Sequence, residues 1–356
     1  MEFLFADWLG TPAWFWLAFI ALVVTLTAFD LGVLNKEDKE MGIGESLRLS
    51  AFYIGIAMAF GAWVWAAKGG EAGLQYYTGF FIEKALSIDN IFVISLIFAT
   101  FAIPPRYQYR ALLWGIVAVI LLRGIMIAGG AALVTEYEWL LYVFAAFLVF
   151  TGIKMLFVGD NPMDVAGNPV VKWLSRHIPI TNELHGEKFF VRVPDSKSGK
   201  LVLAATPLFL ALVVINLADL VFAVDSVPAI FAITTDTFIV YTSNIMAILG
   251  LRALYFALSA MVHRFHYLKY ALALVLVFIG SKIFVADFIL DGDKFPPLVS
   301  LGVTVGLIAG GVIWSLVKTR EDSALPRSKM SAGGLAASDG QAFLPRKARE
   351  ARGLGR

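Results

Sequence analysis

Two aspartates lie inside long apolar stretches of this sequence, Asp89 in ALSIDNIFV and Asp225 in VFAVDSVPA. A carboxylate at the centre of a bilayer costs at least about 2.5 kcal/mol even on insertion-based scales. Each aspartate follows another acidic residue by six positions, Asp89 after Glu83 and Asp225 after Asp219. Acidic side chains repeated in this way predict a buried site for a cation.

Asn90 and Ser226 would add neutral oxygen ligands to these acids. Each follows its acid, Glu83 or Asp219, by seven residues and therefore returns to the same helix face. Carboxylate, amide, hydroxyl and backbone carbonyl oxygens suit hard cations such as Mg²⁺, Ca²⁺ and Mn²⁺. Two carboxylates held close together also share a proton. A divalent cation would displace that proton, so the same residues favour cation/proton exchange.

The spacing limits how the acids can meet. Six residues on a straight helix place two side chains about 120° apart and about 9 Å along the axis. One straight helix therefore cannot hold an ion with both of its acids. We expect two oppositely directed helices to cross near Asp89 and Asp225 and to bring these two carboxylates into one shared site.

Acidic and basic residues are balanced inside the apolar spans. The five acids are Asp30, Glu83, Asp89, Asp219 and Asp225, and the five bases are Lys84, Arg123, Lys154, Arg252 and Lys282. Equal numbers leave open that all of them form structural ion pairs. Buried pairs often add little stability, because desolvation offsets their attraction. We therefore assign the acids to the cation site and the bases to structural or gating ion pairs.

The composition indicates a membrane protein. Of 356 residues, 59% are hydrophobic and 16% are charged, and the mean hydropathy is +0.77. A soluble domain carries about 25% charged residues. The small net charge of +2 gives no indication of a nucleic-acid partner, and the lack of cysteine excludes disulfides and thiolate metal sites.

Nine apolar spans are long enough to cross a bilayer as helices, which predicts an all-α polytopic fold. They cover approximately 12–34, 51–67, 76–103, 111–134, 138–158, 201–233, 243–262, 268–290 and 298–317. We expect a transmembrane transporter domain over 1–320 and a disordered basic cytoplasmic tail over 321–356.

The basic loops predict the orientation of the spans. Arginine and lysine recur in alternate connections, in the long loop 159–200 and in the tail. With nine spans, this places the N-terminus outside, and it places the loop 159–200 and the C-terminus in the cytoplasm. We expect a multi-pass protein of the inner (plasma) membrane.

The acids belong to a larger internal repeat. An acid pair, an arginine one span later and a glycine one span after that recur at offsets of 136, 129 and 128 residues. The matched residues are Glu83 with Asp219, Arg123 with Arg252 and Gly152 with Gly280. A unit of three spans must insert in opposite directions in its two copies, at about 76–158 and 201–290. Inverted repeats of this kind are typical of secondary transporters whose site lies at the repeat interface.

The two spans that carry the acids are longer than a bilayer requires. At about 1.5 Å per residue they would extend well beyond a hydrocarbon core of about 30 Å. Pro207 and Pro228 lie in the second span. We therefore expect both spans to be bent or broken near the aspartates, with backbone carbonyls exposed beside the carboxylates.

With these residues placed, the sequence resembles the TerC/Alx family of integral membrane proteins. The resemblance rests on GFFIEKALSIDNIFV, LVFTGIK, TPLFLALVVINLADLVFAVDSVPAIFAITTD and IVYTSNIMAILGLRALYF, and it covers roughly residues 25–318. The family is associated with tellurite-resistance gene clusters, alkaline response and manganese homeostasis, and it is grouped with LysE-type exporters. The resemblance implies Mn²⁺ efflux, with Glu83, Asp89, Asp219 and Asp225 at the transport site and Asp30 as a weaker candidate.

One position departs from the family pattern. Asn216 occupies a place where the family often has an acid. An amide offers an oxygen but no charge. If position 216 takes part in binding, the affinity or the proton coupling would differ in this chain.

The sequence favours a secondary transporter that exports Mn²⁺ and other divalent cations in exchange for protons, without a cofactor. Whether the chain forms a homo-oligomer in the bilayer is left open. An intramembrane aspartyl protease is disfavoured, because Ile88 and Val224 stand where that class has its signature residues. We therefore do not expect an enzyme. A membrane scaffold that delivers metal to exported proteins is the alternative, with the basic loop and tail as its docking surface.

Overall fold

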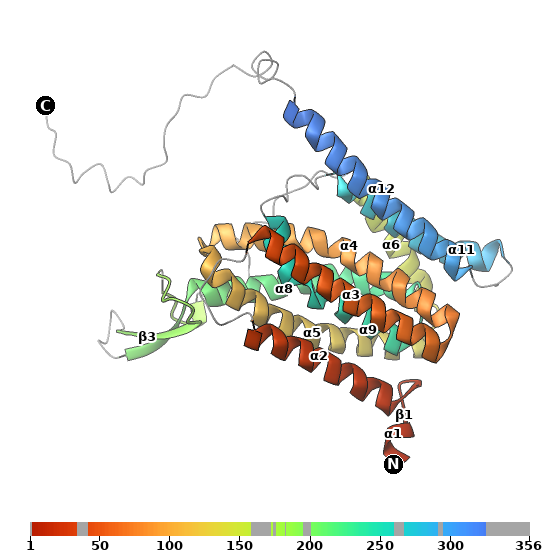
Figure 1. Ribbon diagram of the computed structural model, residues 1–356, viewed down its shortest axis with the longest axis horizontal. Helices are drawn as coiled ribbons and strands as arrows, with labels where there is room; N and C mark the ends of the chain where they lie inside the picture. The colour runs from red at the N-terminus through yellow and green to blue at the C-terminus, as the bar shows by residue number, and fades with distance from the viewer. Residues whose placement is uncertain are drawn as a thin grey trace, which may run out of the picture. The chain divides into compact units, whose positions relative to one another are not determined.

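The computed structural model describes residues 2–33, 42–157, 172–173, 176–181, 183–194, 201–259, 267–290 and 295–324. Figure 1 shows long helices that lie side by side, including α3, α4, α5, α8 and α9. The long helices are α2 (Ala13–Val33), α3 (Ile43–Lys68), α4 (Gly70–Thr100), α5 (Pro105–Glu136), α6 (Leu140–Phe157), α8 (Pro207–Phe231), α9 (Thr237–Leu249) with α10 (Leu251–Leu258), α11 (Leu268–Phe288) and α12 (Pro297–Ala324).

These helices confirm the predicted all-α polytopic membrane protein. Eight helical segments among the described residues are long and apolar enough to cross a bilayer, with α9 and α10 taken as one segment. Helix α4 has the required length, 31 residues, but carries four charged residues, Glu71, Glu83, Lys84 and Asp89. The remaining elements are short: α1 (Glu2–Phe5), the strand pair β1 (Asp7–Trp8) and β2 (Thr11–Pro12), and the strand pair β3 (Phe190–Pro194) and β4 (Leu201–Ala205).

The sixth predicted span begins later than its apolar composition suggested. Residues 201–205 form β4, which pairs antiparallel with β3. Helix α8 begins at Pro207, and the Thr206 side chain caps it by accepting a hydrogen bond from the Phe209 amide. Proline is suited to the first helical position because its missing N–H would have no partner there. The local chemistry of Thr206 and Pro207 therefore decides the boundary.

The helices that carry the acids were expected to be bent or broken near the aspartates, and a break is not observed. Helix α4 is continuous from Gly70 to Thr100, and α8 is continuous from Pro207 to Phe231 although Pro228 lies inside it. Pro228 stands near the end of α8, where few further turns depend on it. The interruption in the second repeat falls instead at Gly250, between α9 and α10.

Helices α6 and α11 pack against each other reciprocally. A Cβ added at Gly152 of α6 would lie 2.6 Å from the carbonyl oxygen of Ala273, and a Cβ added at Gly280 of α11 would lie 2.5 Å from that of Ala145. Gly152 and Gly280 are 128 residues apart, and so are Ala145 and Ala273, so the two contacts are equivalent under the repeat. The end of α6 contacts the start of α11, and the start of α6 contacts the second half of α11, so the two helices are antiparallel. This is the contact that two inverted copies of one unit make about a pseudo-twofold axis.

Helices α4 and α8, the first helices of the two units, are also antiparallel. Ile82 near the middle of α4 shares an apolar cluster with Ala229 near the end of α8. Ile94, further along α4, shares another cluster with Ile215 in the first half of α8. The two helices therefore cross in opposite directions, with the acidic residues near the crossing.

Candidate functional site

Arg123 on α5 is fully buried and contacts acids from both repeats. Its Nε and Nη2 donate to the two carboxylate oxygens of Asp219 at 3.1 and 2.9 Å. Its Nη1 donates to Glu83 and lies 3.2 Å from the Ser226 hydroxyl and 3.0 Å from Oδ1 of Asn244. The Asn244 amide in turn donates to Glu83 at 3.1 Å. We call Glu83, Arg123, Asp219, Ser226 and Asn244 the central polar cluster.

Close helix packing holds this cluster together. A Cβ at Gly79 of α4 would lie 2.8 Å from the Ser243 hydroxyl of α9, and one at Gly115 of α5 would lie 3.7 Å from Ile215 of α8. Glycine at position 79 lets α4 and α9 approach closely, whereas the space at Gly115 would accept a Cβ in ordinary contact.

The electrostatics of the central polar cluster favour an additional cation. Glu83 and Arg123 are fully buried and Asp219 is 7% exposed. The cluster therefore holds two carboxylates and one guanidinium away from water. Breaking a buried ion pair by removing one partner costs about 3–5 kcal/mol, because the other charge remains uncompensated. With one more negative than positive side chain, the cluster attracts positive charge.

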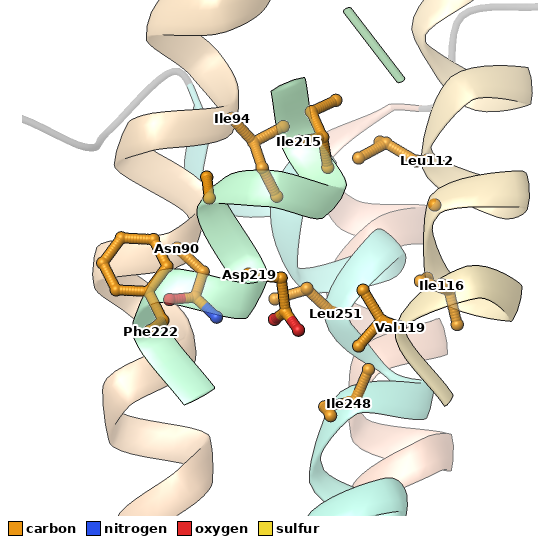
Figure 2. A pocket seen from close by; sticks show the side chains of 12 residues that line it. Asn90, Ile94, Leu112, Ile116, Val119, Ile215, Asp219, Phe222, Ile248 and Leu251 are labelled. Atoms are coloured by element: carbon orange, nitrogen blue, oxygen red, sulfur yellow. The ribbon is translucent and has the colours of Figure 1, made fainter. Parts of the chain in front are cut away.

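A small cavity adjoins the cluster where α4, α5 and α8 meet. Its volume is about 20 Å³, and Asn90, Val119, Asp219 and Phe222 are among its lining residues (Figure 2). This is room for about one water molecule or one ion. Oδ1 of Asn90 is buried and has no hydrogen-bond partner. Asn90 and Asp219 are the two polar residues in a lining that is otherwise apolar.

A larger cavity lies on the opposite side of the cluster. Its volume is about 320 Å³, and its lining includes Thr78 of α4, Phe231 of α8 and Lys282 of α11. Along α4, Glu83 lies between Thr78 and Asn90, which lines the small cavity. The order on α8 agrees, because Ser226 lies between Asp219 and Phe231. The central polar cluster therefore separates the two cavities.

Asp89 and Asp225 lie on neighbouring helix faces, each one residue before a residue that faces the cluster or the small cavity. Both are partly buried, and Asp225 interacts electrostatically with Lys154 of α6. Glu83 of α4 and Ser226 of α8 both contact Nη1 of Arg123, so they lie at the same level. Asp89 follows Glu83 by six residues and therefore lies about 9 Å along the α4 axis from that level. The two carboxylates that contact one common group, the Arg123 guanidinium, are Glu83 and Asp219. Within the described residues, no three acidic or histidine side chains are grouped closely enough to hold a metal ion.

Asp30 lies in a separate cluster, with the arginine of the second repeat. Its carboxylate on α2 is buried and pairs with Arg252 of α10, whose guanidinium lies 4.2 Å from the ring centroid of Tyr109. The Tyr109 hydroxyl donates to the backbone oxygen of Asp30 at 2.8 Å. Nε and Nη1 of Arg252 have no hydrogen-bond partner. The structure therefore gives Asp30 an ion-pair role outside the central polar cluster.

The predicted lysines differ from the predicted arginines in their partners. Lys84 donates to the Ala247 carbonyl at 3.1 Å, and Lys282 approaches the Ser300 hydroxyl at 3.4 Å. Within the described chain these two lysines form no ion pair. Lys154 is exposed beside Asp225.

The positions of Asn216 and Asn244 differ from what the sequence predicted. Asn216 donates to the Leu212 carbonyl of its own helix at 2.8 Å, while its side-chain oxygen is buried without a partner. Asn244 is a member of the cluster but was not among the predicted site residues. The signal was present, since Asn244 is a polar residue inside the apolar stretch TFIVYTSNIMAIL.

Fold and site together define a multi-pass integral membrane protein whose two inverted repeats share one buried charged cluster. The model of the integral membrane protein TerC family matches residues 68–323, and the chain belongs to this family. It is 47% identical over 303 residues to a membrane protein of Rickettsia felis, covering 85% of this chain and 97% of the relative. It is 45% identical over 314 residues to one of Myxococcus xanthus, covering 87% and 94%.

A third relative carries a functional name. The chain is 41% identical over 308 residues to the membrane-bound redox modulator Alx of Escherichia coli K12, covering 84% of this chain and 92% of the relative. No solved structure matches the chain.

Proposed function

We propose that this TerC-family protein is a secondary transporter that exports divalent metal cations, Mn²⁺ foremost, in exchange for protons. The observation that carries the proposal is the meeting of Glu83 and Asp219, one acid from each inverted repeat, between two cavities. A site at the interface of inverted repeats is the arrangement that secondary transporters use.

The ligand chemistry supports a hard divalent cation as substrate. Glu83 and Asp219 supply carboxylate oxygens, and Ser226, Asn244 and Asn90 supply neutral ones. Oxygen ligands of this kind bind Mn²⁺, Mg²⁺ or Ca²⁺ in preference to softer metals. Asp89 and Asp225 add negative charge on the adjoining faces and would attract the cation toward the site.

The cavities support alternating access. The larger one would form the approach from the side on which α4 begins, and the smaller one would form the closed end of the opposite approach. Movement of one repeat against the other would open the small cavity and close the large one. From the loop charges we further propose that the large cavity faces outward across the plasma membrane, with the C-terminus in the cytoplasm.

Proton exchange follows from the same residues. A carboxylate that loses its cation in a site closed to water is stabilised by taking up a proton. Export of one divalent cation would then be coupled to proton entry. The redox role in the name of the Alx relatives, if present in this chain, cannot use thiol chemistry, because the sequence has no cysteine.

The test is transport by the purified full chain in proteoliposomes. A trapped Mn²⁺ indicator and a trapped pH dye follow both ions after Mn²⁺ is added outside. We expect Mn²⁺ uptake accompanied by alkalinisation of the lumen, and faster uptake when the lumen is more acidic than the bath. Mn²⁺ entry no faster than in empty liposomes would contradict the proposal.

A further inference from the structure

Arg123 occupies the place that a bound cation would need. Both oxygens of Asp219 accept hydrogen bonds from its Nε and Nη2. One oxygen of Glu83 accepts from its Nη1, and the other accepts from Asn244. A metal ion binds carboxylate oxygens at about 2.0–2.6 Å. It therefore cannot use these carboxylates while the guanidinium remains bound to all of them.

Electrostatic repulsion also prevents a metal ion and the Arg123 guanidinium from binding the two carboxylates at the same time. A divalent cation and a guanidinium on the same two carboxylates would lie within a few ångströms of each other. In a buried site with an effective dielectric constant of about 20, two unit charges 4 Å apart repel by several kcal/mol. One of the two cations must leave.

We propose that Arg123 is a tethered cation that competes with the transported metal ion for Glu83 and Asp219, and so sets the affinity and the charge selectivity of the site. This inference rests on the proposed function and describes how that site is regulated. In the empty protein the Arg123 guanidinium contacts both carboxylates and balances one of their two negative charges. A monovalent cation gains about half the attraction of a divalent one, so it displaces the guanidinium less readily.

The small cavity gives the Arg123 side chain a direction in which to move, although its volume of about 20 Å³ would have to widen to hold the whole guanidinium. Val119, one turn before Arg123 on α5, lines this cavity together with Asp219. Long side chains of a helix point back toward its N-terminus, which directs Arg123 toward the turn of Val119. Asn90 also lines this cavity, on the side of α4. Displacement of Arg123 toward the turn of Val119 would free carboxylate oxygens of Glu83 and Asp219 for the metal ion.

Arg252 offers a matched comparison within the same chain. It is the repeat equivalent of Arg123, is 1% exposed and also forms a buried ion pair. Its partner, however, is Asp30 and not a carboxylate of the central polar cluster. Loss of Arg252 removes a buried guanidinium without uncovering Glu83 or Asp219.

The experiment measures Mn²⁺ binding to purified full-length protein in lipid nanodiscs, by the loss of the free-Mn²⁺ paramagnetic resonance signal. For Arg123→Gln we expect binding about tenfold to a thousandfold tighter than in the wild type. For Arg252→Gln we expect a Kd within about twofold of the wild type, and Arg123→Gln combined with Glu83→Gln should lose the gain. Mn²⁺ should also raise the thermal unfolding midpoint of Arg123→Gln more than that of the wild type.

Mn²⁺ binding by Arg123→Lys and transport by the wild type test this inference separately from the proposed function. Arg123→Lys retains the charge but cannot bridge both carboxylates, so its Kd should fall between those of the wild type and Arg123→Gln. Binding by Arg123→Gln or by Arg123→Lys that is no tighter than the wild type would overturn the inference, even if wild-type liposomes transport Mn²⁺. Absence of wild-type transport, with tighter binding in Arg123→Gln, would refute the exporter alone.

Discussion

Glu83 on α4 and Asp219 on α8 bind the same guanidinium, although they lie 136 residues apart in the sequence. They are equivalent residues of two inverted units, and Arg123 lies between them. The duplicated acids therefore act on one group and not at two separate sites.

The charge balance of the central polar cluster predicts unequal costs of substitution. Arg123→Met would leave Glu83 and Asp219 buried without a counter-cation, and we expect a loss of about 3–5 kcal/mol. Glu83→Gln leaves one carboxylate with one guanidinium, and we expect a loss of about 1–2 kcal/mol. Thermal unfolding in detergent at low metal concentration measures both. Equal unfolding midpoints for the two variants would contradict the ionic account.

The reciprocal glycine contact predicts that two substitutions in different helices have the same effect. Gly152→Ala and Gly280→Ala each place a Cβ within 2.6 Å of a backbone oxygen. We expect each to destabilise the protein by about 1–3 kcal/mol, as overpacking does.

Gly302→Ala on α12 is the matched control for these glycine variants, because nothing lies within 4 Å of its added Cβ. It should be neutral or stabilising, since alanine favours a helix over glycine by about 1 kcal/mol. A loss of stability at Gly302 equal to that at Gly152 would remove the packing argument. Thermal unfolding of the three variants decides the matter.

The Asp30–Arg252 pair predicts a strong coupling between α2 and α10. Asp30→Asn would leave a buried guanidinium that already has two unsatisfied nitrogens. We expect this single change to cost about 3–5 kcal/mol, and the added change Arg252→Met to restore part of the loss. A double-mutant cycle by thermal unfolding measures the coupling. Additive effects of the two substitutions would argue against a buried ion pair.

Asp236 has two separable roles at the start of α9. Its carboxylate accepts from the amides of Phe238 and Ile239 and lies 2.7 Å from Lys68. Asp236→Ala removes cap and ion pair and should cost about 1–2 kcal/mol, whereas Asp236→Ser keeps the cap. Since partly exposed ion pairs contribute at most about 1 kcal/mol, Asp236→Ser should recover most of the loss. Equal unfolding temperatures for Asp236→Ser and Asp236→Ala would show that the cap does not contribute this stability.

Much of the fold was predictable from hydropathy and the repeat. The predicted apolar segments correspond to α4 and to the eight helical segments of the described chain that are apolar enough to cross a bilayer, and the offset that matches Gly152 with Gly280 reappears as a packing contact. The start of α8 was misplaced because β4, Leu201–Ala205, is as apolar as a membrane helix. Helix continuity near Asp89 and Asp225 was also misjudged, since length alone does not require a break.

The candidate site was predictable in its residue types but not in its pairings. Spacing correctly placed Ser226 on the face of Asp219, because both contact Arg123. It could not tell which acids meet, since that depends on the rotation of α4 and α8 about their axes at the crossing. Nor could it show that Arg123 enters the cluster while its counterpart Arg252 binds Asp30. That difference depends on packing against α2, which lies outside the repeats.

The central claim is tested most directly by the initial rate of Mn²⁺ uptake into proteoliposomes containing Glu83→Gln, Asp219→Asn or Glu187→Gln. Glu187 is the control, because it is partly exposed and pairs with Arg110 away from the cluster. We predict that Glu83→Gln and Asp219→Asn each lose at least about 99% of the wild-type rate, since a binding loss of about 2.7 kcal/mol is a hundredfold. Glu187→Gln should retain the wild-type rate. Folded Glu83→Gln or Asp219→Asn protein that transports Mn²⁺ as fast as the control would contradict the account.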